Sequence, residues 1–132
     1  MTPKEVALEF ARRINSQNVD ALCQLMTPDH KFVDSLGAVV DGRETMRNGW
    51  TGYFRMVPDY QISFNEIFEH GSTVAAFGKA GGTFAVNGKL AEENRWQVPA
   101  AWWISIQDNL VAEWRVYADN EPIRRLIAKQ QE

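Results

Sequence analysis

The chain has 132 residues, of which 45% are hydrophobic and 23% are charged, a composition typical of a globular protein. This length predicts a single domain over residues 1–132, because a second core would need a longer chain. Lys and Arg total 14 against 17 for Asp and Glu, and the formal net charge of −3 argues against nucleic acid or an acidic membrane surface as a partner.

Few residues are suited to metal or cofactor binding. Cys23 is the only cysteine, which excludes an internal disulfide and a cysteine-based zinc site. His30 and His70 lack the spacing of a metal motif, and no glycine-rich nucleotide motif is found, so we expect neither a metal nor a cofactor. The first residues are too charged for a signal peptide, and no apolar run approaches about 18 residues, so the sequence predicts a cytoplasmic protein.

Two helices are predicted at the start of the chain. The first begins at the capping box Thr2-Pro3-Lys4-Glu5 and ends near Ser16. Its apolar stripe recurs every four residues and consists of Val6, Phe10 and Ile14. Asn18 is expected to cap the second helix, which Thr27-Pro28-Asp29 should stop.

A short pair of strands and a third helix are predicted next. The strands span residues 30–34 and 38–40 and are joined by a turn at residues 35–37. Asp41 is expected to cap the following helix, with Glu44 completing a second capping box, and Pro58 to close it. The buried stripe of this helix consists of Met46, Trp50, Phe54 and Val57.

The second half of the chain predicts long antiparallel strands. Tyr60, Ile62 and Phe64 alternate along the first, and the next spans residues 73–86 and ends at an Asn87-Gly88 hairpin turn. A third strand is expected from residue 89 through 96, bent at Pro99. Residues 99–119 then form two strands around a turn at residues 107–109. Their period of two places Trp102, Trp114 and Val116 on the covered face, and Trp103 and Tyr117 on the outer face.

This order of elements predicts an α+β fold in which a curved antiparallel sheet wraps around the N-terminal helices as a conical barrel. We expect an internal cavity between Trp50 of the third helix and the tryptophans of the last strands. Gly78, Gly81 and Gly82 would allow the bend that such curvature requires. A short helix is expected after Glu121-Pro122.

Four local features occur in an order that resembles the nuclear transport factor 2-like, or SnoaL-like, superfamily. They are Val33-Asp34 at a strand end, Asp41-Gly42-Arg43-Glu44, Pro58-Asp59, and the terminal Trp114-Arg115-Val116-Tyr117-Ala118-Asp119. The resemblance covers essentially the whole chain. The superfamily includes ketosteroid isomerases, limonene epoxide hydrolases and small polyketide cyclases, together with binding modules, so the fold does not fix the function.

The resemblance to ketosteroid isomerases implies one catalytic residue and two missing ones. Those enzymes use a carboxylate at the end of the first strand as the base, and Asp34 falls at this position. Their oxyanion hole needs a tyrosine on the first helix, where this chain has Phe10, and an aspartate where it has Trp102. Limonene epoxide hydrolases and the cyclases have an acid where this chain has Val116, which argues against both mechanisms.

Three carboxylates compete for a functional role. Asp34 either faces the cavity as a base or only caps the turn that follows it, and the sequence leaves both interpretations open. Glu66 continues the apolar face of its strand, but a shift in strand register explains it equally well. Asp119 lies opposite Trp114 by parity and is expected to help cap the last helix.

Two hypotheses follow. The first is an isomerase- or cyclase-like enzyme that removes a proton next to a carbonyl of an apolar substrate, with Asp34 as the catalytic base. The second is a non-catalytic ligand-binding or scaffold protein of the same fold. The first predicts an apolar small-molecule ligand, and the second leaves open whether the cavity holds such a ligand or is filled by side chains. We also expect a homodimer formed through the outer face of the sheet. The expected substrate-binding residues are Phe10, Phe32, Trp50, Phe54, Trp102, Trp114 and Val116.

Overall fold

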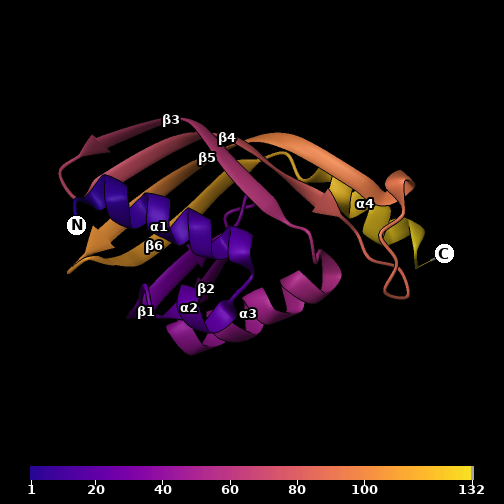
Figure 1. The fold of residues 1–132 in the computed structure, drawn as a ribbon, viewed down its shortest axis with the longest axis horizontal. Helices are drawn as coiled ribbons and strands as arrows, with labels where there is room; N and C mark the ends of the chain where they lie inside the picture. The colour runs from indigo at the N-terminus through magenta and orange to yellow at the C-terminus, as the bar shows by residue number, and fades with distance from the viewer. Residues whose placement is uncertain (132) are drawn as a thin grey trace.

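The computed structural model describes residues 1–131 and has the predicted α+β fold. Its helices are α1 (Pro3–Ser16), α2 (Val19–Cys23), α3 (Arg43–Met56) and α4 (Glu121–Lys129), with a short 3₁₀ helix η1 (Glu92–Asn94). Its strands are β1 (Met26–Val33), β2 (Val39–Asp41), β3 (Gln61–His70), β4 (Thr73–Thr83), β5 (Arg95–Gln107) and β6 (Leu110–Ala118). The long strands β3 to β6 arch over α1, and α3 lies on the far side of α1 from them (Figure 1).

The six strands form one curved sheet in the order β2-β1-β6-β5-β4-β3. The sheet is mixed, because β1 runs parallel to β6 while the other neighbours are antiparallel. Parallel neighbours need a long connection, and here α3 and several strands separate β1 from β6. The predicted cone is therefore correct in shape, but it is an open one, with β2 and β3 at its two edges.

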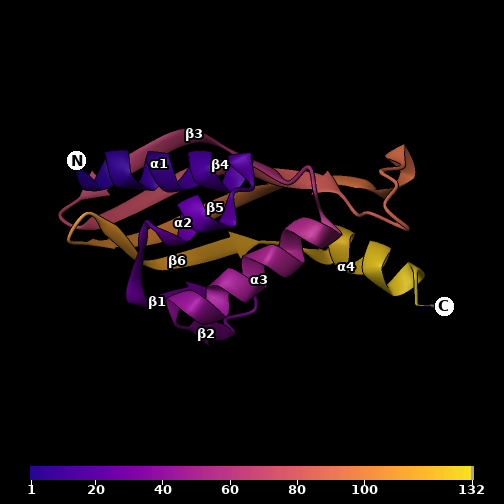
Figure 2. The ribbon, with the colours of Figure 1, turned by 60° about the horizontal axis from the view of Figure 1, so that its bottom comes forward.

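Helix α1 fills the concave side of the sheet. Val6, Phe10 and Ile14 have no exposed surface, as their spacing predicts. Helix α3 packs against β1 and α2. Helix α4 lies at one end of the sheet, and the N-terminus of α1 lies at the other end (Figure 2). Residues of α3, of the end of β1 and of the last part of β6 line a cavity.

The helix starts are partly as predicted. Thr2 and Glu5 form the capping box of α1, and Asn18 accepts a hydrogen bond from the Ala21 amide at the start of α2. The predicted Asp41 cap of α3 is wrong. Asp41 pairs with Lys31 as the last residue of β2, and the chain turns into the helix at Gly42, whose φ of 101° favours glycine.

Two strand boundaries also differ from the prediction. Residues 27–29 were expected to stop α2, but they belong to β1, which starts at Met26. The turn at Asn87-Gly88 forms, with both residues at positive φ. The strand predicted over residues 89–96 is wrong, because a loop and η1 occupy this segment and β5 begins at Arg95. Strand β5 continues through Pro99, which lies beyond the end of the β6 ladder, where a missing N–H is tolerated.

Two glycines of β4 lie where the backbone of a neighbouring strand approaches closely, Gly78 beside β3 and Gly81 beside β5. The register between β3 and β4 shifts between Phe64 and Glu66, opposite Gly78. A Cβ atom at Gly78 would lie 1.8 Å from the Ser63 carbonyl oxygen, and one at Gly81 would lie 2.4 Å from that of Trp96. A larger residue at either position would require the neighbouring backbone to shift.

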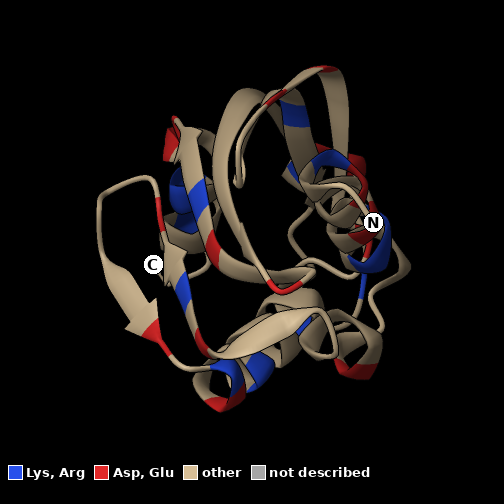
Figure 3. Cartoon of the chain, turned by 90° about the vertical axis from the view of Figure 1, so that its left-hand side faces the viewer, with Lys and Arg blue, Asp and Glu red and all other residues tan. Residues whose placement is uncertain are grey.

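Positively and negatively charged residues are interspersed along the helices and strands (Figure 3). Several form short-range ion pairs on the surface, such as Arg13 with Glu9 and Arg125 with Glu121. Within residues 1–131, the structure has no helix with the length and apolarity needed to cross a bilayer.

Candidate functional site

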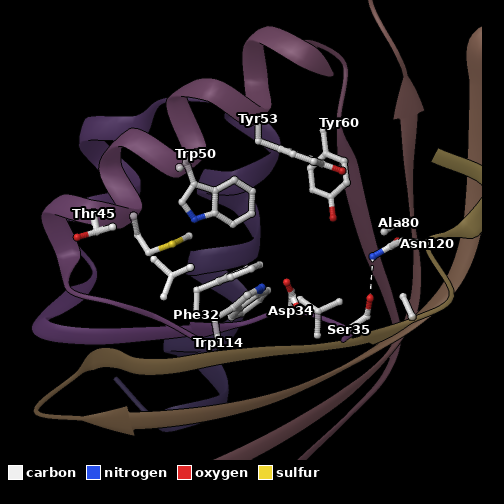
Figure 4. Close-up of a pocket in the computed structure, with 15 residues that line it drawn as sticks. Phe32, Asp34, Ser35, Thr45, Trp50, Tyr53, Tyr60, Ala80, Trp114 and Asn120 are labelled. Atoms are coloured by element: carbon white, nitrogen blue, oxygen red, sulfur yellow. Dashed lines mark hydrogen bonds between the residues drawn. The ribbon is translucent and has the colours of Figure 1, made fainter. Parts of the chain in front are cut away.

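A cavity of about 490 Å³ lies between α3, the β1–β2 turn and the inner face of β6 (Figure 4). Its wall is mainly apolar, with the polar side chains of Asp34, Ser35 and Asn120 at one end and Thr45 at the other (Figure 4). The lining residues are Phe32, Asp34, Ser35, Val40, Thr45, Met46, Gly49, Trp50, Tyr53, Tyr60, Ala80, Trp114, Val116, Ala118 and Asn120.

Asp34 is the one charged residue among those that line the cavity. It follows the last residue of β1, where the sequence placed it. Phe32 pairs with Trp114 across the β1–β6 ladder, and alternation along the strand places Asp34 on the same face as Phe32. Its carboxylate therefore faces the apolar chamber (Figure 4).

The two oxygens of the Asp34 carboxylate have different surroundings. Oδ1 accepts hydrogen bonds from the Leu36 and Ala38 amides, each at 2.9 Å, and so caps the β1–β2 turn. Oδ2 makes no hydrogen bond to any other described residue. Asp34 thus caps the turn, as one of the two interpretations expected, and it also lines the cavity, while its role as a base stays a prediction.

Aromatic rings from β1, α3 and the residue just before β3 form one wall of the cavity. Trp50 packs edge-on against Phe32 and Tyr53, with ring centroids 6.0 and 6.2 Å apart. Tyr53 in turn packs at 90° against Tyr60, with 5.0 Å between centroids. Because each ring is held by its neighbours, this wall has a defined shape before any ligand enters.

Tyr60 is the main site residue that the sequence reasoning missed. Its side chain is only 8% exposed, and its hydroxyl points into the cavity without a hydrogen bond to any described residue (Figure 4). Burial raises the pKa of this hydroxyl, and the neighbouring Tyr53 adds to the effect, so the group stays protonated. The alternation of Tyr60 with Ile62 and Phe64 was the signal that could have placed it on the inner face.

Asn120 is a second residue that the sequence did not indicate. It lies at the N-terminus of α4 and donates a hydrogen bond of 3.1 Å from Nδ2 to the Ser35 hydroxyl. This bond connects the start of α4 to the β1–β2 turn at the polar end of the cavity (Figure 4). No local pattern could have found it, because 85 residues separate the two partners.

Four of the seven residues expected to bind substrate line the cavity, namely Phe32, Trp50, Trp114 and Val116. The other three are not among the lining residues. Phe10 stacks on Trp114, Trp102 packs between Trp114 and Phe64, and Phe54 packs on Trp50. They belong to the packed core that supports the cavity wall.

Glu66 and Asp119 lie outside the cavity. The register shift in β3 leaves Glu66 exposed, as the structural interpretation expected. Asp119 is exposed as well, and its Oδ1 accepts a hydrogen bond from the Glu121 amide at the start of α4. Asp34 is thus the carboxylate on which acid–base chemistry in this cavity would depend.

Comparison with known proteins identifies the family of this fold. A family model described as a SnoaL-like domain matches residues 7–114. A search of curated proteins finds no match.

Three solved structures illustrate the similarity. A protein from Catenulispora acidiphila with a ketosteroid isomerase-like fold, solved in complex with trimethylamine, has a TM-score of 0.77 at 20% identity and covers 90% of this chain and 88% of its own. A proposed SnoaL-like polyketide cyclase from Shewanella putrefaciens has a TM-score of 0.81 at 15% sequence identity. The match covers 98% of this chain and 88% of the cyclase. IdmH of Streptomyces antibioticus, also a proposed polyketide cyclase, has a TM-score of 0.78 at 19% sequence identity. The match covers 97% of this chain and 99% of IdmH. Identities this low show a common fold only.

Proposed function

Because the chain belongs to the SnoaL-like domain family, we propose that it binds an apolar small molecule in the cavity between α3 and β6 and acts on it as an isomerase- or cyclase-like enzyme. A volume of about 490 Å³ supports this proposal, since ligand sites in proteins typically measure roughly 300–1,000 Å³. The mainly apolar wall with a few polar groups at one end suits a compound of about two fused rings that carries one oxygen.

The observation that carries the catalytic part is the free Oδ2 of Asp34 beside an apolar chamber. In the proposed step, Oδ2 takes a proton from the carbon next to a ligand carbonyl. The electron pair of the broken C–H bond moves to form an enolate, whose negative charge lies on the carbonyl oxygen. Return of the proton to the same carbon restores the ligand and exchanges its hydrogen, whereas delivery of the proton to another carbon of the conjugated system completes an isomerisation without any other reactant.

The second candidate is a non-catalytic protein that binds an amine. Among the described residues that line the cavity, none is positively charged to balance Asp34, so a ligand ammonium group would complement it, and nearby aromatic faces favour such cations. The Catenulispora protein of the same fold was solved with trimethylamine, which supports this alternative.

The Asp34→Asn variant distinguishes the two candidates. The probe for the first is 2-tetralone, whose α-hydrogens are exchanged for deuterium in D₂O when a base removes them, as NMR detects. For the enzyme, the variant should lose this exchange by a factor on the order of 10² to 10⁴ while its affinity for 2-tetralone is nearly unchanged.

For the amine-binding protein, the wild type should bind trimethylammonium and the variant should not. Exchange at the wild-type rate in the variant would show that the base lies elsewhere.

We also propose that the chain forms a homodimer through the outer face of its sheet. Four large side chains are exposed there, with exposed fractions of 56% for Phe68, 47% for Phe77, 37% for Trp103 and 54% for Tyr117. Phe77, Ala101 and Tyr117 are paired across β4, β5 and β6, so the apolar surface is continuous. Arg115 and Glu113 lie beside it, and a patch with both charges suits a second copy related by two-fold symmetry.

Sedimentation should show a dimer at micromolar concentration, and Phe77→Glu should yield a monomer. A monomeric wild type would contradict the proposal.

A further inference from the structure

We infer that the Tyr60 hydroxyl donates a hydrogen bond to the oxygen atom of the ligand, and that this contact selects ring compounds bearing a neutral carbonyl. The binding contact stands independently of the proposed function, whereas its effect on catalysis rests on the proposed function. The inference concerns the residue just before β3, away from both positions at which the family resemblance called for such a donor, where the chain has Phe10 and Trp102.

The first argument is the unused hydroxyl of Tyr60. A hydroxyl that is open to a cavity and not used within the protein is available to donate a hydrogen bond to a ligand. Tyr60 is among the buried residues, yet its hydroxyl has no partner among the described residues and points into the cavity (Figure 4). A donor in this state is complementary to an acceptor atom on the ligand.

The second argument is that Tyr60 is fixed in position. Its ring packs against Tyr53 and, at 6.2 Å between centroids, against Trp96. Its amide donates to the Val57 carbonyl at 3.2 Å, and its own carbonyl accepts from the Gln17 side chain at 2.9 Å. A donor that is already oriented needs no reorganisation when negative charge develops on the ligand oxygen, which is the condition for effective stabilisation of an enolate.

The third argument is the relation of Tyr60 to Asp34. The hydroxyl enters the cavity from the α3–β3 side and the carboxylate from the β1–β2 turn, so a ligand at this end has the donor and the base on opposite sides (Figure 4). Charge selects the same ligand class. A carboxylate ligand would be repelled by Asp34, whereas a ketone presents a neutral acceptor to Tyr60 and an acidic C–H bond to Asp34.

The test compares 2-tetralone with tetralin, which has the same two rings without the oxygen. Tryptophan fluorescence gives the affinity for each, since Trp50 and Trp114 line the cavity. Wild-type protein should prefer 2-tetralone, and Tyr60→Phe should reduce that preference by about fivefold to tenfold while affinity for tetralin is unchanged.

Deuterium exchange into 2-tetralone should fall by a factor on the order of 10² to 10³ in the same variant. Tyr53→Phe, which removes the neighbouring hydroxyl, should have a much smaller effect on both quantities.

The outcomes separate this inference from the proposed function. If Tyr60→Phe keeps the wild-type preference, or if the wild type shows no preference for 2-tetralone, Tyr60 does not bind the ligand oxygen and the inference is wrong. Loss of exchange in Asp34→Asn alone would then still support the proposed enzyme. If the wild type prefers 2-tetralone through Tyr60 but exchanges no deuterium, the binding contact stands and the catalytic proposal fails. A larger loss in Tyr53→Phe than in Tyr60→Phe would assign the donor to Tyr53 instead. A thermal melt of each variant checks that the protein remains folded.

Discussion

Phe10 of α1 stacks on Trp114 of β6 with 4.7 Å between their ring centroids. Trp114 lines the cavity, and Phe10 does not. Trp114 therefore separates the cavity from the core beneath α1. Phe10, which was expected among the substrate-binding residues, is here part of the support for the cavity wall.

Replacing Phe10 with Ala should accordingly affect stability and leave the chemistry of the site intact. Loss of a fully buried phenylalanine typically lowers the free energy of unfolding by about 3–5 kcal/mol. Leu8→Ala, at an exposed position of the same helix, is the control and should change it by less than about 1 kcal/mol. Urea denaturation measures both. A Phe10→Ala variant of normal stability that discriminates poorly between 2-tetralone and tetralin would place Phe10 at the ligand instead.

Val116→Asp tests which face of β6 lines the cavity. The variant would add a second carboxylate to a chamber that already holds Asp34, without a positive partner. We expect a loss of several kcal/mol in unfolding free energy, or a strongly raised pKa of the new carboxyl. Val39→Asp, on exposed β2, should stay within about 0.5 kcal/mol of the wild type. Equal stability of the two variants, together with a normal titration of the introduced carboxyl in NMR spectra, would contradict the assignment.

His30 should make the stability depend on pH. Its Nδ1 donates a 2.7 Å hydrogen bond to the Val111 carbonyl, while Nε2 is buried without a partner among the described residues, so the neutral ring is favoured. Burial lowers the pKa of His30, against smaller opposing effects from the hydrogen bond, Glu113 and Asp29. As the pH falls below the ordinary histidine value of about 6.5, the unfolded chain takes up the proton first, so the free energy of unfolding decreases until folded His30 titrates too.

Urea denaturation at pH 7.5 and 5.5 measures this loss. His30→Asn, which retains an N–H donor, should lose less stability between the two pH values than the wild type does. His70→Asn, at an exposed position, should behave like the wild type. Identical pH dependence in all three proteins would show that His30 makes no such contribution.

Two glycine substitutions should act in opposite directions. Gly78→Ala would place a methyl group 1.8 Å from the Ser63 carbonyl oxygen, so β3 and β4 must separate and the unfolding free energy should fall by well over about 1 kcal/mol. Gly52→Ala, at an exposed position of α3 with no atom within 4 Å of the new Cβ, should raise it by about 0.5–1 kcal/mol. Thermal unfolding of both proteins checks the difference, and a stabilised Gly78→Ala variant would contradict the close contact seen in the sheet.

Alternation along the strands was the part of the fold that the sequence predicted best. It placed Trp102, Trp114 and Val116 inside, and Trp103 and Tyr117 outside, as the structure shows. The boundaries that failed depend on distant pairing. Strand β1 extends to Met26 because it joins β6, and the segment before Arg95 forms no strand although its hairpin turn is correct.

The cavity was harder to predict than the core for a physical reason. An apolar residue on the inner face satisfies the same sequence pattern whether it contacts a ligand chamber or another side chain, so Phe32 and Trp50 could not be told apart from Phe10 and Phe54. The polar end was missed for a different reason. Tyr60 and Asn120 come from distant segments, and only the folded chain shows that they lie near Asp34.

A crystal structure of the protein soaked with 2-tetralone tests the central claim most directly. The account predicts density for the two rings between Trp50 and Val116, with the ketone oxygen within about 3.2 Å of the Tyr60 hydroxyl and an α-carbon facing Oδ2 of Asp34. A ligand bound only on the outer face of the sheet would contradict it. So would an empty cavity at a concentration that saturates the fluorescence signal.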